Sequence, residues 1–439
     1  MTEENIKAAE KLNDFIKKSP TAFHAVQTIS DILDKKGFTC LSEADEWNLK
    51  EGGKYYVTRN LSSIIAFTIP QGNPVSFMIT ASHTDSPTYK LKSECESDAF
   101  GKYIKLNVEG YGGMIASTWL DRPLSVAGRV IVKKDNEIKS VLVNIDRDLL
   151  IIPNVAIHQN RSVNNGYAFN AAVDMMPLFS SENGRGGMKK LIAEEVGCDE
   201  KEILSTDLYL YNRTPSSVFG YESEFFASSR IDNLECAYTT LMGFISSASN
   251  TVNTVKIYSS FDNEETGSET KQGAGSGFLY DVISEICDSF SVNMRAALAS
   301  SFMVSADNGH AKHPNHPELS DSQNAPHLNG GIVIKSNSAQ KYTTDALSAS
   351  VFSEICKNAG VPVQQFANRS DMAGGSTLGS ISNTKVSLNT VDIGLAQLAM
   401  HSSYETAGCA DILYMIKAVE EFYKTEIKCL SDGVYIIVK

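Results

Sequence analysis

The stretch Val75-Ser-Phe-Met-Ile-Thr-Ala-Ser-His-Thr-Asp-Ser-Pro87 decides how this chain can fold. Its first half, from Val75 to Thr80, is an apolar run of strand length, and it leads into a polar loop that contains His83 and Asp85. In open α/β sheets, ligands bind at the carboxyl ends of the strands. The stretch therefore predicts a strand of a sheet with candidate catalytic or ligand-binding residues at its carboxyl end.

Alternating strand and helix patterns surround this stretch. Before it, helices are predicted over 6–16 and from Ser19-Pro20 to Gly37, and an extended run covers 62–69. Beyond residue 223, strands are predicted at 254–261, 297–306, 331–334 and 385–391, and helices at 277–290, 344–359 and 408–423. Such alternation predicts an α/β fold, in which a mixed but mainly parallel sheet carries helices on both faces.

The segment 94–223 shows a different sequence pattern, with short alternating runs and glycine-rich stretches in place of alternating strands and helices. Short alternating runs at 124–132 and 138–145 flank Asp135-Asn136, as in a hairpin, and glycine-rich stretches lie at 110–113 and 184–187. We interpret 94–223 as an inserted, mostly β domain. Residues 1–93 and 224–439 then form one catalytic domain.

Composition excludes several functional classes. The 439 residues carry 39 Lys plus Arg and 52 Asp plus Glu, a net charge of −13, which disfavours nucleic acid and anionic membranes as partners. No stretch approaches the length of an apolar membrane span, and the first residues lack the apolar core of a signal peptide. The eight cysteines are widely spaced without a C-x-x-C pair. The sequence predicts a soluble, cytoplasmic protein whose metal ligands are histidines and carboxylates.

Five polar clusters fall at or after predicted strands, or before predicted helices: His83 with Asp85, Asp232, Glu264 with Glu265, Asp307, and His401. At such positions they converge at the carboxyl edge of the sheet. Carboxylates gathered in one crevice repel one another unless cations neutralise them. A two-metal hydrolytic site has this composition, with ions about 3.5–4 Å apart that share a carboxylate and a water.

The residue types also suggest roles. Histidine nitrogen and carboxylate oxygen suit zinc, with cobalt or manganese as alternatives. One of the adjacent acids Glu264 and Glu265 can bind metal while the other takes a proton from water. Asp85, two residues after His83, can accept the second imidazole N–H and set its tautomer. Each pattern alone also fits a turn, a helix cap or a solvated surface. The prediction of a metal site therefore depends on all five clusters occurring together at the ends of predicted elements.

Six motifs together resemble one known family. They are Ser19-Pro-Thr-Ala-Phe-His-Ala-Val, Ser82-His-Thr-Asp-Ser-Pro, Ser229-Arg-Ile-Asp-Asn-Leu, Asp262-Asn-Glu-Glu-Thr-Gly-Ser, Asp307-Asn-Gly-His-Ala-Lys-His-Pro-Asn and Met400-His-Ser. In order and separation they are similar to the aspartyl aminopeptidases, a family of dinuclear zinc exopeptidases. The resemblance spans nearly the whole chain.

Matched motif by motif, the resemblance implies two zinc ions per chain. His83, Asp232 and Asp307 would hold one ion; Asp232, Glu265 and His401 would hold the other, with Asp232 as the bridge. Glu264 would be the general base. The implied substrate-binding residues are His158, Glu264, Asp307, His310, Lys335 and Tyr342.

The resemblance also implies an assembly. In relatives the inserted domain forms dimers, the histidine matching His158 reaches a neighbouring subunit's active site, and dimers build a tetrahedral dodecamer. We expect the same homo-oligomer here. One departure is that Asn308-Gly309 follows Asp307 where many relatives carry bulkier residues such as Met-Ala, which leaves the local pocket shape open.

The sequence thus predicts a metallo-aminopeptidase that removes Asp or Glu from peptides with a free N-terminus. Because the chain is acidic overall, an acidic preference requires a local cation, for which Lys335 is the candidate. The alternatives are a related two-metal amidohydrolase, an aminopeptidase of neutral specificity, or a non-catalytic assembly scaffold.

Overall fold

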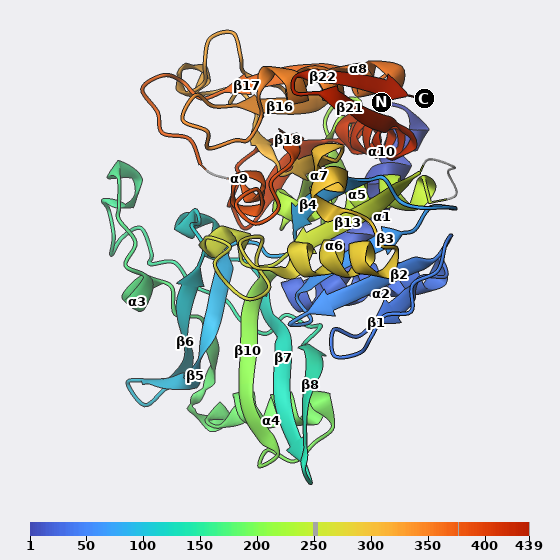
Figure 1. Ribbon diagram of the computed structural model, residues 1–439. Helices are drawn as coiled ribbons and strands as arrows, with labels where there is room; N and C mark the ends of the chain where they lie inside the picture. Colours follow the sequence, from blue (N-terminus) through green and yellow to red (C-terminus); the bar gives the residue numbers. More distant parts are fainter. Residues whose placement is uncertain (249–252, 376, 439) are drawn as a thin grey trace.

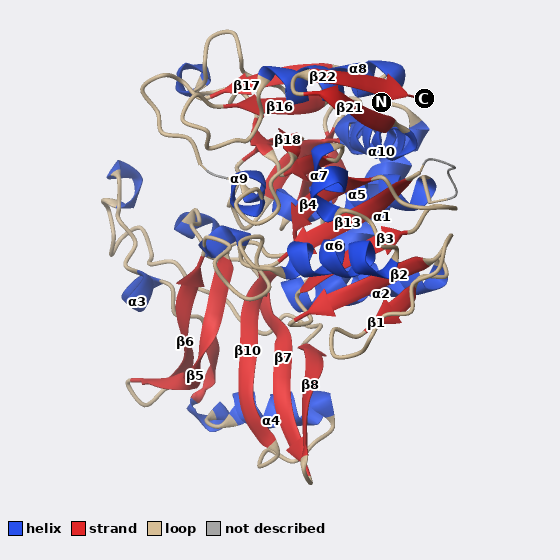
Figure 2. Cartoon of the chain, viewed as in Figure 1, coloured by secondary structure: helices blue, strands red, loops and turns tan. Residues whose placement is uncertain are grey.

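The computed structural model describes residues 1–248, 253–375 and 377–438, and it shows three sheets of five or more strands (Figures 1 and 2). The largest has nine strands. In spatial order they are β1 (Thr39–Leu41), β2 (Lys54–Arg59), β3 (Ser63–Thr68), β13 (Thr254–Phe261), β4 (Ser76–His83), β14 (Phe302–Ala306), β18 (Asn389–Gly394), β16 (Ile332–Ser336) and β17 (Val363–Ala367).

This nine-stranded sheet is mixed and mainly parallel, as predicted. The central neighbours β13, β4, β14 and β18 all run parallel to one another, whereas β3 and β16 run antiparallel to β13 and β18. In the register, Phe261 of β13 pairs with His83 of β4, and Ser305 of β14 pairs with Ala81. The carboxyl ends of three central strands therefore meet at one edge.

Helices cover both faces of this sheet, which confirms the predicted fold class. One apolar core joins it to α1 (Glu3–Lys18), α2 (Ala22–Lys35), α5 (Ile231–Ser246), α8 (Ala346–Asn358) and α10 (Cys409–Lys424). A second core joins it to α6 (Phe278–Ser289), α7 (Met294–Ala299) and α9 (Leu378–Ser382). Along β4, Met78 faces the first core, whereas Phe77 and Ile79 face the second. A strand buried on both faces explains why its sequence is an almost continuous apolar run.

A six-stranded antiparallel sheet lies beside the nine-stranded sheet, in the lower part of Figure 1. Its order is β8 (Glu137–Asn144), β7 (Leu124–Lys134), β10 (Ile203–Asn212), β5 (Thr88–Ala99), β6 (Tyr103–Tyr111) and β9 (Leu178–Ser181). It has its own apolar core, which includes residues of α4 (Gly187–Val196). The sheet begins at Thr88, earlier than the predicted boundary at residue 94. The division into domains stays a prediction.

Smaller elements complete the chain. A five-stranded sheet consists of β11 (Ser217–Phe219), β12 (Phe225–Ser228), β20 (Glu405–Gly408), β19 (Ala396–Leu398) and β15 (Gly309–His310). A hairpin of β21 (Glu426–Ser431) and β22 (Val434–Val438) follows α10. The short helices are α3 (Ala171–Asp174), η1 (Ala116–Trp119), η2 (Val163–Asn165), η3 (Glu182–Gly184), η4 (Glu264–Thr266) and η5 (Pro317–Leu319). Among the described residues, no helix is long and apolar enough to cross a membrane.

Two predicted element boundaries were wrong. The segment predicted as a strand from residue 297 continues α7 as far as Ala299, and β14 starts only at Phe302. The Asn293 side chain accepts a hydrogen bond from the Ala296 amide and caps the start of this helix. The apolar residues that follow had suggested a strand instead. The second helix has Thr21 rather than Ser19 at its N-cap, since Ser19 ends α1.

Candidate active site

Sheet register brings the predicted site residues to one edge. His83 is the last residue of β4, and Asp307 follows β14 directly. Glu264 and Glu265 lie in η4 just after β13, where Asn263, at φ 64°, turns the chain. Asparagine tolerates this left-handed conformation better than most residues. Asp232 lies in the first turn of α5, and His401 lies between β19 and β20.

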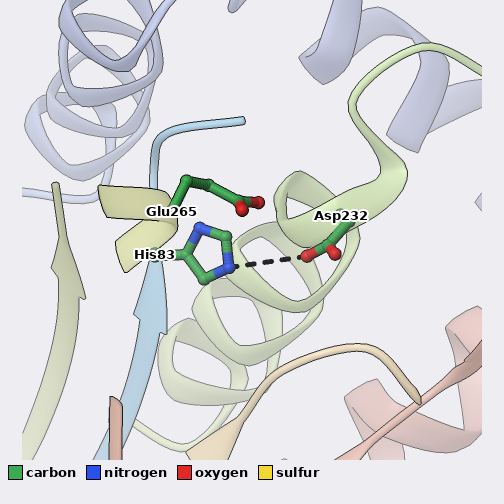
Figure 3. Close-up of side chains that lie close together, drawn as sticks. All are labelled: His83, Asp232 and Glu265. Carbon is green, nitrogen blue, oxygen red and sulfur yellow. Dashed lines mark ion pairs between the residues drawn. The ribbon is translucent and has the colours of Figure 1, made fainter. Parts of the chain in front are cut away.

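Asp232 lies between the two histidines. Its Oδ1 is 3.4 Å from His83 Nε2, and its Oδ2 is 3.3 Å from His401 Nε2. His83 Nε2 is also 3.5 Å from Asp307 Oδ1, and His401 Nε2 is 3.3 Å from Glu265 Oε2. Figure 3 shows His83, Asp232 and Glu265 facing a common space. The five predicted metal ligands are therefore neighbours.

The donor set fits zinc. One ligand atom from each of His83, Asp232 and Glu265 lies within 4.8 Å of the other two. Asp232 Oδ1 and Glu265 Oε1 are buried and have no hydrogen-bond partner in the described part of the chain. A buried carboxylate oxygen without a partner is costly, and a cation would satisfy it. Burial would lower the pKa of His83, but Asp232, Asp307 and Asp85 raise it well above its usual value. The cluster thus carries the excess negative charge that a divalent cation neutralises.

Glu264 borders the ligand cluster. Its Oε2 lies 4.0 Å from His83 Nε2, and its side chain is 14% exposed. Burial raises the pKa of Glu264 to about 8, against the opposing effect of His83. A partly exposed carboxyl group at the border of the ligand cluster is placed to accept a proton and to return it.

Asp85 organises the segment behind the ligands. His83 Nδ1 hydrogen-bonds the main-chain carbonyl of Asp85 at 3.0 Å and lies 3.3 Å from its Oδ1. The Asp85 carboxylate accepts the main-chain N–H groups of Glu264 and Glu265, at 3.2 Å each. The hydrogen bond to the imidazole therefore goes to the main chain of Asp85, while its carboxylate lies near the imidazole and holds the turn that presents both glutamates.

Lys335 faces the site from β16. The side chain is 3% exposed, and its Nζ lies 3.3 Å from Asp307 Oδ2 and donates to the Asn308 carbonyl at 2.8 Å. The Tyr342 ring centroid is 5.6 Å from the same Nζ. Burial would lower the pKa of Lys335, but Asp307 and Tyr342 raise it, so the side chain stays a cation.

Comparison with known proteins identifies the family to which this chain belongs. A family profile described as "Aminopeptidase I zinc metalloprotease (M18)" matches residues 15–423. The chain belongs to the M18 family of zinc aminopeptidases. The resemblance drawn from the six motifs is thereby confirmed at the level of the family.

Individual relatives of this M18 chain cover almost its full length. A "Probable M18 family aminopeptidase 2" of Clostridium novyi is 46% identical over 95% of this chain and 99% of its own. A structure described as the Ape4 and Nbr1 complex contains a chain that is 36% identical, with a TM-score of 0.93, over 96% of this chain and 86% of that one. The S. cerevisiae mApe1 dodecamer is 29% identical, with a TM-score of 0.84, over 95% and 96% of the two chains.

The M18 chain does not bring every predicted substrate-binding residue to the cluster. His310, on β15, does lie near the cluster: burial lowers its pKa, and the charges of Lys335 and Asp232 also affect it. His158 is exposed on the long segment between β8 and β9, and no contact joins it to the cluster among the described residues. Asn308 points into the interior, where its amide donates to Glu235 and Gln397 at 3.0 and 2.8 Å. Asn308 therefore takes part in the packing behind the site.

Two residues of this M18 site were not predicted from sequence. Glu405 accepts from the main-chain amides of Asp232 and His401, at 3.1 and 2.8 Å, so it holds two predicted ligands at once. Tyr111, at the end of β6, donates to Asp85 Oδ2 at 2.7 Å. No local sequence pattern identifies Glu405 as a site residue. Tyr111 lies within the glycine-rich stretch 110–113, and such a stretch indicates that the backbone can approach another segment closely.

Proposed function

We propose that this M18 aminopeptidase holds two zinc ions and removes acidic residues from peptide N-termini. The observation that carries the two-ion proposal is the position of Asp232, whose two oxygens face two different histidines. A carboxylate placed in this way suits a bridge between two ions. His83 and Asp307 complete one ligand set, and Glu265 and His401 complete the other. Cobalt and manganese suit the same donors.

The bound cations would supply Lewis acidity toward the scissile carbonyl and an acidified water at neutral pH. The chain supplies the proton transfer. Glu264 takes a proton from the attacking water on a carboxylate oxygen and returns it to the nitrogen of the leaving amine. Asp85 holds the Glu264 amide and contacts His83 Nδ1, so that the base and the imidazole keep a common orientation.

The preference for Asp or Glu rests on Lys335. It is a buried cation in a strongly acidic chain, and its position next to Asp307 puts it beside the reacting centre. A cation in a partly desolvated site attracts a carboxylate more strongly than the surface charge repels it at long range. His310 and Tyr342 flank this position and complete the proposed pocket. A free α-amine is required, because metal and acidic side chains would hold it.

We propose that the protein is a homo-oligomer in which dimers assemble into a tetrahedral dodecamer. The 29% identical S. cerevisiae mApe1 is described as a dodecamer. The exposed segment that carries His158 is then free to reach a neighbouring subunit's site. Light scattering tests this, with an expected mass twelve times the 47.8 kDa of the chain. We also propose a cytoplasmic location, since all eight cysteines are free thiols.

One experiment tests the activity. Purified protein is analysed for zinc and assayed on Asp-, Glu- and Leu-para-nitroanilide and on an N-acetyl amino acid, with and without chelator. The proposal predicts near-stoichiometric occupancy of two zinc ions, chelator-sensitive activity and preference for Asp or Glu. Preference for Leu would indicate neutral specificity, and hydrolysis of the N-acetyl amino acid alone would indicate an amidohydrolase. Protein free of metal and activity would indicate a scaffold.

A further inference from the structure

The hydroxyl of Tyr111 joins the six-stranded sheet to the active site. Tyr111 is the last residue of β6 and belongs to a different sheet from His83, the proposed metal ligand nearest to it in sequence. Its Oη donates to Asp85 Oδ2 at 2.7 Å and accepts from Asn263 Nδ2 at 2.8 Å. Among the described residues that bond the Asp85 carboxylate, only Tyr111 comes from that sheet.

The partner of this hydroxyl touches three site residues. Asp85 Oδ2 accepts both the Tyr111 hydroxyl and the Glu265 amide, while Oδ1 accepts the Glu264 amide and lies 3.3 Å from His83 Nδ1. A carboxylate that serves three groups on different segments must keep one rotation about its Cβ–Cγ bond. The short bond from Tyr111 is the contact that selects this rotation, because the two amide bonds are longer.

The surrounding packing holds Tyr111 in place. Its ring meets the Tyr209 ring edge-on, with centroids 5.7 Å apart at 80°. The next residue, Gly112, has φ 73°, and a Cβ atom there would lie 3.1 Å from Cβ of Glu265. The end of β6 therefore lies directly against the turn that carries Glu264 and Glu265. Glycine is needed for both the left-handed backbone and the close approach.

We propose that Tyr111 is a positioning residue for catalysis, acting through Asp85 on His83 and on the Glu264–Glu265 turn. This inference rests on the proposed role of Glu264 as the base. Without the hydroxyl, the Asp85 carboxylate loses its shortest bond and the turn can move relative to His83. The chemical step then slows, while substrate binding at Lys335, on another strand, changes little.

The test compares Tyr111→Phe with Tyr89→Phe. Tyr89 is a buried tyrosine of the neighbouring strand β5 that packs on Trp119, so it controls for removing one hydroxyl from the same sheet. Removing a hydrogen-bond partner of this kind typically costs about 10–100-fold. We expect Tyr111→Phe to lower kcat by that factor with KM and zinc content near wild type, and Tyr89→Phe to change kcat less than about two-fold. Equal kcat for Tyr111→Phe and wild type would overturn the proposal.

A double-mutant cycle tests the route through Asp85. If Tyr111 acts only through this carboxylate, adding Tyr111→Phe to Asp85→Asn lowers kcat no further. Independent, multiplying losses would reject the positioning role. Should Tyr111→Phe not fold, Asn263→Gly keeps the left-handed backbone and removes the donor to the same hydroxyl, and its smaller loss should likewise vanish beside Asp85→Asn. An inactive wild-type protein would instead contradict the proposed function, so the two failures are distinguishable.

Discussion

The Nζ atom of Lys335 lies 3.3 Å from Oδ2 of Asp307, so the buried cation of the proposed specificity pocket touches a predicted metal ligand. The Asn308 carbonyl, at 2.8 Å, holds the same ammonium group. Gly309, the next residue, lies beside the same side chain, since a Cβ there would be in van der Waals contact with Cε of Lys335, at 3.6 Å. The proposed specificity pocket is therefore adjacent to the proposed metal site.

Lys335→Met should reduce the preference for acidic substrates. The variant removes the positive charge and keeps most of the side-chain length, so the activity on Asp- and Glu-para-nitroanilide should fall relative to that on Leu-para-nitroanilide. Losing a buried charge pair costs about 2–5 kcal/mol, so we expect a fall of at least about 30-fold in the ratio of kcat/KM values. The exposed neighbour Lys341→Met is the matched control and should leave the ratio unchanged. An unaltered ratio in Lys335→Met would remove Lys335 from the specificity pocket.

Glu264→Gln should keep zinc and lose activity. The amide is isosteric but cannot accept the proton of water, so kcat should fall by about 10²–10⁴-fold, the usual contribution of a general base. Zinc content is measured in the same preparation. Glu269→Gln makes the same change at an exposed position five residues away and should be fully active. A fully active Glu264→Gln enzyme would rule out the proposed base.

His401→Ala should lose both metal and activity, unlike Glu264→Gln. His401 faces Asp232 and Glu265, so its removal opens one proposed ligand set. Treatment of wild-type enzyme with chelator should have the same effect on activity, and zinc, cobalt or manganese should restore it. Elemental analysis and the Asp-para-nitroanilide assay measure the two quantities. Retention of two zinc ions by His401→Ala would show that the ligand assignment is incorrect.

Lys256 should make stability depend on pH. Its side chain on β13 is buried, donates to the Ser247 carbonyl and has its pKa lowered by burial to about 8. Between this value and the unfolded value of about 10.4, the unfolded chain binds more protons, so stability rises with pH. Relative to Lys256→Met, the free energy of unfolding of the wild type should increase by about 2 kcal/mol between about pH 7.5 and about pH 10.

Denaturant titrations at the two pH values measure this difference. The control is Lys92→Met, an exposed lysine on β5, for which the difference from wild type should not change with pH. A constant difference for Lys256→Met would show that Lys256 does not titrate differently in the folded and unfolded chains.

Much of the catalytic fold could be predicted from local pattern. The run at 254–261 became β13 with the same bounds, since a short segment rich in β-branched and aromatic residues favours a strand. The segment after Ala297 could not be predicted, because a short apolar run fits a helix or a strand and the Asn293 cap decided between them. The hairpin of β21 and β22 also escaped prediction.

The site could be predicted as a set of residues but not as a geometry. His83, Asp232, Glu265, Asp307 and His401 were recognisable because each follows or precedes an element of regular structure. Their distances depend on the register of β13, β4 and β14, which no local pattern contains. The hydrogen bond from His83 goes to the main-chain carbonyl of Asp85, and the bonds from Tyr111 and to the two glutamate amides were not foreseen.

The sequence by itself determined many of the strands and helices around the nine-stranded sheet, and which candidate metal-binding side chains stand at their ends, because these depend on periodicity and residue type over a few neighbours. Only the tertiary structure decided that Asp232 would lie between two histidines, that Lys335 would be buried against Asp307, and that β6 would bring Tyr111 to Asp85. Such contacts join residues far apart along the chain. They arise from sheet pairing and from packing between sheets, where the free energy belongs to the assembled core rather than to any one segment.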